Sequence, residues 1–296
     1  MLESGFERAS VGSHRGGWEQ QPARTADEHP QRWCAHCLER RHPRVHDHTA
    51  RIQRLPRGPA CRRRDLPCPE VGAQGRRSSG WCGSEGGFAP DLPRNEDGLR
   101  LVLGAIERAG YTPGEQISIA LDCAAQEFCH GDSYHIDGKV LSGSQLGDLY
   151  SSWLDNYPIT SLEDAFGEDD WSSWSEFTAR EGHRVQVVGD DLYVTNPTRL
   201  AKGIAEGASN AILIKLNQIG TVSETLRVIE MARTAGFTTV ISHRSGETSD
   251  DIIADFAVGT DAGQIKTGAP ARSDRTSKYN QLLRIAERCD VFTNLF

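Results

Sequence analysis

The stretch VQVVGDDLYVTNPTRLAKGIAEGASNAILIK, residues 185–215, contains one complete strand–helix–strand unit. Its two ends, VQVVGDDL and AILIK, are short β-rich runs that stop at charged residues. Between them, NPTRLAKGIAEGA begins with Asn196 as a helix cap followed by Pro197, a pair that favours a helix start. Apolar strands joined by a helix predict a parallel sheet whose faces are covered.

The same pattern recurs from residue 116 onward. Each apolar run ends at a polar residue, and these residues are Asp122, Glu163, Asp190, Lys215, His243 and Lys266. After a first interval of 41 residues they lie 27, 25, 28 and 23 apart, about one βα unit each. Polar residues at the carboxyl ends of strands are typical of the active face of a (β/α) barrel. We therefore predict an α/β fold, an incomplete TIM barrel of about six βα units.

Three of these strand ends are carboxylates. Asp122, Glu163 and Asp190 end successive strands, so they should converge at one rim. Oxygen ligands of this kind suit Mg²⁺. The alternative for any one of them is a strand-end or helix-cap acid that faces water.

Cationic residues end the next strands. Arg244 and Lys266 suit a phosphate or a carboxylate. Lys215 follows three apolar residues, where desolvation and neighbouring cations would make it a general base. His243 taken alone is better explained by a structural role. In the loop GSEGGFAPDL, Glu85 lies beside glycines that permit close approach to a ligand, which makes it a candidate general acid.

Longer motifs around these residues resemble enolase, the phosphopyruvate hydratase of glycolysis. They are GSEGGFAP, IALDCAAQEF, YPITSLEDAFGEDDW, VVGDDLYVTNP, LIKLNQIGTVSET, ISHRSGETSDD, GQIKTGAPARSDR and KYNQLLRIAE, from about Gly83 to Glu287. The resemblance implies a Mg²⁺-dependent lyase that converts 2-phospho-D-glycerate to phosphoenolpyruvate. It also implies a homodimer, although much of the family's contact surface would lie in a part that this chain does not show.

The resemblance assigns roles residue by residue. It implies that Asp122, Glu163 and Asp190 are the metal ligands. Lys215 would be the proton acceptor, which removes the proton α to the carboxylate, and Glu85 the proton donor to the leaving 3-hydroxyl. The substrate-binding residues that it implies are Glu163, Asp190, Lys215, Ser242, His243, Arg244, Ser245 and Lys266.

Residues 1–82 differ in composition from residues 83–296, which we take as the partial barrel domain. The first segment has 15 Arg, no Lys and 9 acidic residues, and its formal charge of +6 precedes a charge of −14 in the remainder. We expect this Arg-, His- and Cys-rich segment to be disordered, without a credible fold. Zinc binding by Cys34, Cys37, His42, His46 and His48 is one interpretation, and nucleic-acid binding by an arginine-rich arm is a less favoured second.

The third interpretation is an out-of-frame translation of an enolase gene. With permitted codons, residues 27–48 read one nucleotide later give MNILNGGAHTASNVDIHEFMI, which resembles the first two barrel strands of enolase. The same offset applied to LPCPEVGAQGRRS permits YHALKSVLKAEGL, which resembles the helix that leads to GSEGGF. Two ordered matches favour a frame change that is restored near residues 81–83.

Three functional classes therefore remain open. The first is an enolase-derived lyase, and the second is a catalytically impaired enolase-like fragment that survives as a relic or an interaction protein. The third, less favoured, is a zinc- or nucleic-acid-binding N-terminal module fused to that remnant. No apolar run is long enough to span a membrane, and the N-terminus lacks the apolar core of a secretory signal. We expect a cytoplasmic protein with reduced thiols, although members of the family also occur at the cell surface or secreted without a signal peptide.

Overall fold

The structure is a computed structural model that describes residues 34–39, 81–82 and 85–288. Its main feature is a seven-stranded sheet with the order β1-β4-β8-β9-β10-β11-β12. Six of these strands run parallel to their neighbours. They are β4 (Ile117–Asp122), β8 (Ile159–Glu163), β9 (Gln186–Gly189), β10 (Ala211–Ile214), β11 (Thr238–Ser242) and β12 (Ile265–Lys266). Each predicted apolar run forms one of them, which confirms the predicted fold class of a partial TIM barrel.

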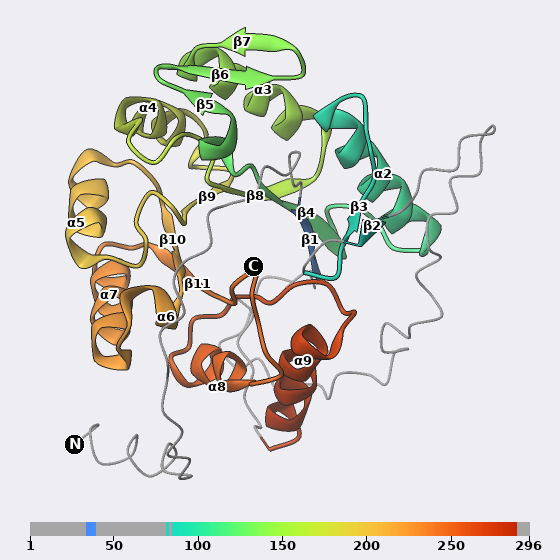
Figure 1. Ribbon diagram of the computed structural model, residues 1–296, viewed down its shortest axis with the longest axis vertical. Helices are drawn as coiled ribbons and strands as arrows, with labels where there is room; N and C mark the ends of the chain where they lie inside the picture. Colours follow the sequence, from blue (N-terminus) through green and yellow to red (C-terminus); the bar gives the residue numbers. More distant parts are fainter. Residues whose placement is uncertain (1–33, 40–80, 83–84, 289–296) are drawn as a thin grey trace, which may run out of the picture. The chain divides into compact units, whose positions relative to one another are not determined.

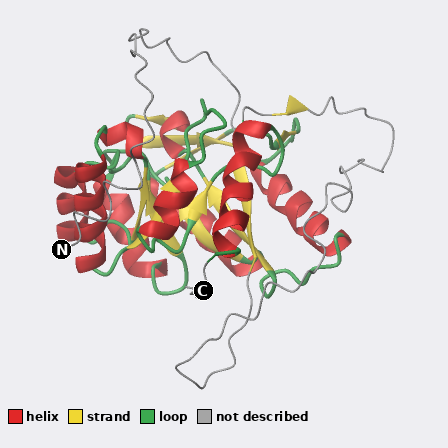
Figure 2. Cartoon of the chain, turned by 90° about the horizontal axis from the view of Figure 1, so that it is seen from below, coloured by secondary structure: helices red, strands yellow, loops and turns green. Residues whose placement is uncertain are grey.

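Helices lie outside the curved row of strands (Figures 1 and 2). They are α2 (Asn95–Arg108), α3 (Gly143–Asn156), α4 (Trp171–Glu181), α5 (Pro197–Glu206), α6 (Leu216–Ile219), α7 (Val222–Thr234), α8 (Ile252–Gly259) and α9 (Ser273–Ala286). The apolar residues of the strands are buried beneath them. All four residues of β10, for example, are completely buried. Fully burying one such side chain stabilises the fold by about 1.5–3 kcal/mol.

The expected helix signals are present at α5. The side chain of Asn196 accepts hydrogen bonds from the backbone N–H groups of Thr198 and Arg199, and Pro197 is the first helical residue. Gly207 ends the helix with a φ of +63°, a conformation that costs glycine little. These local signals place the boundaries of the helix between β9 and β10.

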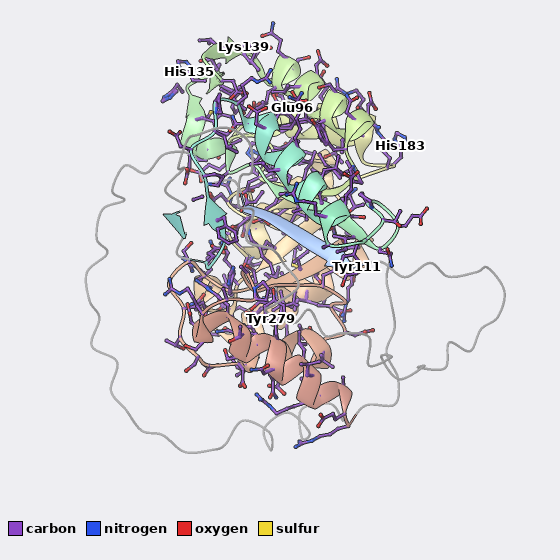
Figure 3. The ribbon with its side chains drawn as sticks, turned by 90° about the vertical axis from the view of Figure 1, so that its right-hand side faces the viewer. Glu96, Tyr111, His135, Lys139, His183 and Tyr279 are labelled. Atoms are coloured by element: carbon purple, nitrogen blue, oxygen red, sulfur yellow. The ribbon has the colours of Figure 1, made fainter. Side chains whose placement is uncertain are left out.

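The 41-residue interval between Asp122 and Glu163 contains more than one βα unit. The short helix η1 (Ala125–Phe128) leads into a three-stranded antiparallel meander, β5 (Cys129–His130), β6 (Ser133–Ile136) and β7 (Lys139–Leu141), before α3 begins. Figure 3 shows His135 and Lys139 of this meander at one end of the molecule and Tyr279 of α9 nearer the other. The meander explains why this interval is longer than the rest.

The described residues contain three further short strands. The strand β2 (Trp81–Cys82) pairs with β3 (Phe88–Ala89). The strand β1 (Cys34–Glu39) pairs antiparallel with β4, with Cys34 opposite Asp122 and Glu39 opposite Ile117. The sequence analysis expected no strand before Gly83. A sheet edge exposes unpaired N–H and C=O groups and accepts an extended segment of almost any sequence, which is why the apolar pattern gave no sign of β1.

The interpretations of the N-terminal segment lie mostly outside the described residues. His42, His46, His48 and the arginine-rich stretch belong to residues 40–80, and the side chains of Cys34 and Cys37 are likewise not described. The zinc, nucleic-acid and reading-frame hypotheses therefore stay predictions. Among the helices that are described, none has the length and apolar composition of a membrane span.

Candidate active site

The parallel strands bring the predicted polar residues to one edge of the sheet. Asp122 lies opposite Glu163 in the β4–β8 register, and Ser242 lies opposite Lys266 in the β11–β12 register. Asp190 directly follows β9 and Lys215 directly follows β10. The carboxyl ends of all six strands thus form one rim, as a barrel-type active site requires.

Lys266 connects two strands that are far apart in the sheet order. Its Nζ lies 2.7 Å from Asp122 Oδ2 on β4 and 2.6 Å from Glu163 Oε1 on β8. Because β12 and β4 stand at opposite ends of the parallel strands, this contact requires the sheet to curve round on itself. Burial by itself would lower the pKa of Lys266, but the charges of Asp122 and Glu163 outweigh it and hold this pKa well above its usual range.

A second ion pair joins the next two strand ends. The ammonium of Lys215 donates to Asp190 Oδ2, and both side chains are largely buried. The other carboxylate oxygen of Asp190, Oδ1, is buried and has no hydrogen-bond partner among the described residues. A buried carboxylate oxygen of this kind is costly unless a further cation or donor binds it.

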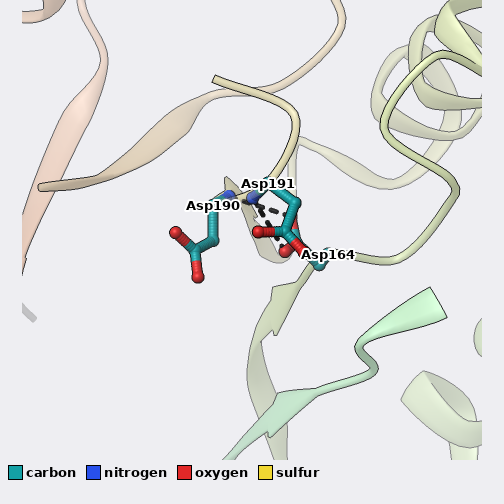
Figure 4. A group of neighbouring side chains, drawn as sticks. All are labelled: Asp164, Asp190 and Asp191. Carbon is teal, nitrogen blue, oxygen red and sulfur yellow. Dashed lines mark hydrogen bonds between the residues drawn. The ribbon is translucent and has the colours of Figure 1, made fainter. Parts of the chain in front are cut away.

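Two acids that the sequence analysis did not select lie beside Asp190. The carboxylate of Asp164 accepts hydrogen bonds from the backbone N–H groups of Asp190 and Asp191, at 2.8 and 2.9 Å (Figure 4). Ligand atoms of Asp164, Asp190 and Asp191 all lie within 4.8 Å of one another. Asp164 has a left-handed backbone conformation, with a φ of +43°, which is uncommon outside glycine. Their only sequence signal was their position, directly after Glu163 and Asp190 in the pairs ED and DD.

The acidic half of the rim carries excess negative charge. Burial and the neighbouring charge of Asp122 raise the pKa of Glu163 to about 8, against the lowering effect of Lys266. Burial and the charge of Asp190 likewise raise the pKa of Asp164 and of Asp191. The cations of Lys215 and Lys266 do not balance five carboxylates.

A bound divalent cation would offset this charge. The donor set consists of carboxylate oxygens, which are hard ligands that suit Mg²⁺, and it includes the unpartnered Oδ1 of Asp190. Asp122 and Glu163, two of the predicted ligands, instead hold the ammonium of Lys266 in this structure. The three-carboxylate cluster shares only Asp190 with the predicted ligand set.

The other predicted residues gather on the opposite part of the rim. Ser245 Oγ donates to Glu85 Oε1 at 3.2 Å, and His243 Nε2 lies 3.4 Å from Glu85 Oε2. Arg244 reaches outward, and its Nη1 lies 3.4 Å from Asn217 Oδ1 in α6. Ser242 is buried, and its hydroxyl donates to the backbone carbonyl of His243. Four of these residues could face a ligand, while the hydroxyl of Ser242 is occupied by the backbone.

The loop after β12 holds Glu85 against this group. The backbone N–H of Ala269 donates to the carbonyl of Glu85 at 3.0 Å. Gly268, with a φ of +77°, lies so close that a Cβ there would come within 3.0 Å of Glu85 O and of His243 Cε1. Glycine at this position therefore permits the approach of Glu85 to His243.

Helix α9 supplies two buried cations that the sequence analysis missed. Arg275 is fully buried, and it donates to the backbone carbonyls of Arg244 and Ser245 at 2.8 and 2.7 Å. Lys278, one turn later, bonds Glu247 Oε2 and the carbonyl of Thr248. The stretch SDRTSKYNQLLR reads as a polar surface helix, so no local pattern distinguishes these two side chains from exposed ones.

Comparison with known proteins agrees with this geometry. The sequence matches the family model "Enolase, C-terminal TIM barrel domain" over residues 69–292. A curated protein named enolase, from Natranaerobius thermophilus, is 57% identical over 207 residues, which are 69% of this chain and 48% of that protein. The chain therefore spans about half the length of the curated relative that it matches.

Proposed function

The chain belongs to the enolase family through its C-terminal TIM-barrel domain, and on that premise we propose that its rim is a site for the Mg²⁺-dependent dehydration of 2-phospho-D-glycerate to phosphoenolpyruvate. The observation that supports the proposal most strongly is that the rim has an acidic part and a separate part that contains Glu85. Buried carboxylates with an unpartnered oxygen lie on one part, and Glu85, His243 and Ser245 lie together on the other.

The proposed roles follow from the chemistry of each side chain. Lys215 takes the proton α to the substrate carboxylate, and it must first leave Asp190 so that its nitrogen can accept that proton. Glu85 gives a proton to the departing hydroxyl, beside the Nε2 of His243. Arg244 and Ser245 hold the phosphate, the guanidinium by its paired N–H groups.

The acidic half of the rim holds the metal in this proposal. We assign Asp190 to Mg²⁺, together with Asp122 and Glu163 once Lys266 has moved from them to the substrate carboxylate. Bound Mg²⁺ would stabilise the negative charge that develops on the substrate carboxylate. Asp164 would hold the backbone that carries Asp190.

Turnover by the purified full chain tests this function. We expect phosphoenolpyruvate to form from 2-phosphoglycerate with Mg²⁺, and to stop forming with EDTA. Lys215→Met should abolish turnover, because it removes the amine that takes the proton in this proposal. Lys139→Met is the matched control, since Lys139 is exposed on β7 in the meander, and it should retain full activity. Equal activity of wild type and Lys215→Met would refute the assignment of the base.

A second candidate is a non-catalytic enolase-like fragment. It is favoured by a sheet in which β12 and β1 are not paired in the described part. Such a fragment would bind Mg²⁺ at the carboxylates without turning over substrate. Isothermal titration with Mg²⁺, performed beside the turnover assay, separates the two candidates.

A further inference from the structure

His243 is enclosed by groups that fix its hydrogen bonds. Its side chain is almost completely buried, and the Nη1 of Arg275 bonds its Nδ1. The same guanidinium also donates to the carbonyls of Arg244 and Ser245, so its position does not depend on the imidazole. Gly268 lies beside the ring, where an added Cβ would come within 3.0 Å of Cε1.

The chemistry of the guanidinium decides which nitrogen of His243 carries the proton. Arginine has only N–H donors and stays charged at every ordinary pH. The Nδ1 that it contacts must therefore act as an acceptor without a proton. In a neutral imidazole the proton then resides on Nε2, which lies 3.4 Å from Glu85 Oε2.

We propose that Arg275 is a positioning residue that holds His243 as a neutral imidazole with its proton on Nε2. His243 is then a hydrogen-bond donor toward Glu85 and the departing hydroxyl of a bound substrate, and it never serves as a base. The role toward substrate rests on the proposed function, whereas the protonation pattern does not.

The charged groups around the ring leave Nδ1 to the guanidinium. Arg275 contacts Nδ1, where it can only donate. Arg244 follows His243 in the chain, and Lys266 is in the paired strand β12, where its backbone carbonyl accepts from the N–H of His243. Glu85 is the acid on the Nε2 side, and Asp274 pairs with Arg275 rather than with the ring.

Nuclear magnetic resonance of the full chain tests the protonation pattern directly. Long-range ¹H–¹⁵N correlation of the labelled wild type distinguishes protonated from unprotonated ring nitrogens, and His243→Gln identifies the signals of His243 by their loss. We expect an unprotonated Nδ1 and a protonated Nε2 in the neutral ring. A neutral ring with its proton on Nδ1 would overturn the proposal.

Variants of α9 test whether Arg275 is the cause. In Arg275→Met we expect the His243 ring to populate both tautomers, because the donor that keeps Nδ1 an acceptor is gone. Arg275→Lys, which keeps one donor and the charge, should restore part of the wild-type pattern. Lys278→Met is the matched control, because it removes another buried cation of the same helix, whose bonds go to Glu247, Thr248 and Asp274.

Four results separate the possible outcomes. If Lys278→Met shifts the His243 signals as much as Arg275→Met does, the shift reflects a general change in the packing of α9, and the proposal fails. If folded Arg275→Met keeps the wild-type pattern, the proposal also fails. In an active enzyme, kcat should fall about tenfold or more in Arg275→Met while KM changes little, as for other orienting partners. A wild type without turnover but with the expected signals would refute the proposed function and leave the protonation pattern standing.

Discussion

Removing the charge of Glu163 should stabilise the metal-free chain at alkaline pH. The pKa of this buried carboxyl is raised from its ordinary value of 4.5 to about 8, chiefly by burial and by Asp122. Between these two values the folded chain retains a proton that the unfolded chain has released. The folding free energy therefore weakens as the pH rises through this window, by about 1.4 kcal/mol per pH unit.

The full loss over the window amounts to about 5 kcal/mol for Glu163 alone. The raised pKa of Lys266 adds no slope there, because this group is charged in both states until the pH passes its ordinary value of 10.5. The raised pKa values of Asp164 and Asp191 add slope of the same sign. Glu163→Gln removes the contribution of Glu163, because its neutral amide corresponds to the protonated carboxyl and the effect of Lys266 is already part of the raised pKa. We expect the variant to be about 4 kcal/mol more stable than the wild type near pH 8 and to differ little from it near pH 5.

Urea unfolding in EDTA at constant ionic strength, at several values between about pH 5 and pH 8, measures these differences. The exposed Glu127→Gln serves as the control and should follow the wild type at every pH. Saturating Mg²⁺ should flatten the wild-type slope, because a bound cation replaces the missing positive charge. The reasoning is refuted if metal-free wild type becomes more stable from pH 5 to pH 8, or if Glu163→Gln retains the whole slope.

The other predictions concern single contacts of the rim and the core. Asp164→Asn places an amide N–H₂ against the backbone N–H of Asp190 or Asp191. The affinity for Mg²⁺, measured by calorimetric titration, should therefore fall about 10- to 100-fold. Unchanged affinity would show that Asp164 does not position Asp190 for the metal. Gly268→Ala should lower the free energy of unfolding, measured with urea, by about 1–3 kcal/mol, because the new Cβ would lie 2.8 Å from Arg275 Cδ. Gly207→Ala is the control and should cost less, because Gly207 has a similar φ but open space around the added Cβ. Trp174→Ala should lower the free energy of unfolding by about 3–5 kcal/mol in the same assay, since this side chain is fully buried. Trp171 is partly exposed, so Trp171→Ala should cost less. A larger loss for Trp171→Ala than for Trp174→Ala would contradict the burial of Trp174.

The sequence predicted the strands and the rim because both depend on local patterns. Apolar runs such as AILI must be buried, and the residue that ends each run reaches the carboxyl edge of a parallel sheet. The site partners depend instead on contacts between distant segments. Lys266 is 144 residues from Asp122 and 103 residues from Glu163, and no spacing rule connects them.

Buried charges on α9 and beside Asp190 were harder to foresee for the same reason. Arg275 reaches the backbone of a loop about 30 residues earlier, and in the sequence it looks like any surface arginine of a polar helix. Asp164 appeared to be a loop acid, yet its carboxylate lies inside the protein and holds the next strand end. A residue type shows what a side chain can bind, but only the fold shows which partner it meets.

The two halves of the rim differ in the contacts that hold their side chains in position. Around His243, the buried cations of α9 bond the loop carbonyls directly, so the position of this loop does not depend on a ligand. The acidic half depends on Lys266, whose ammonium joins β12 to β4 and β8 across the open side of the sheet. A metal bound by Asp122, Glu163 and Asp190 would displace this ammonium and would connect β4, β8 and the end of β9 without β12. Metal binding and the curvature of the incomplete barrel are therefore coupled, and the stability of this chain should depend on bound cation more than that of a barrel closed by its own backbone.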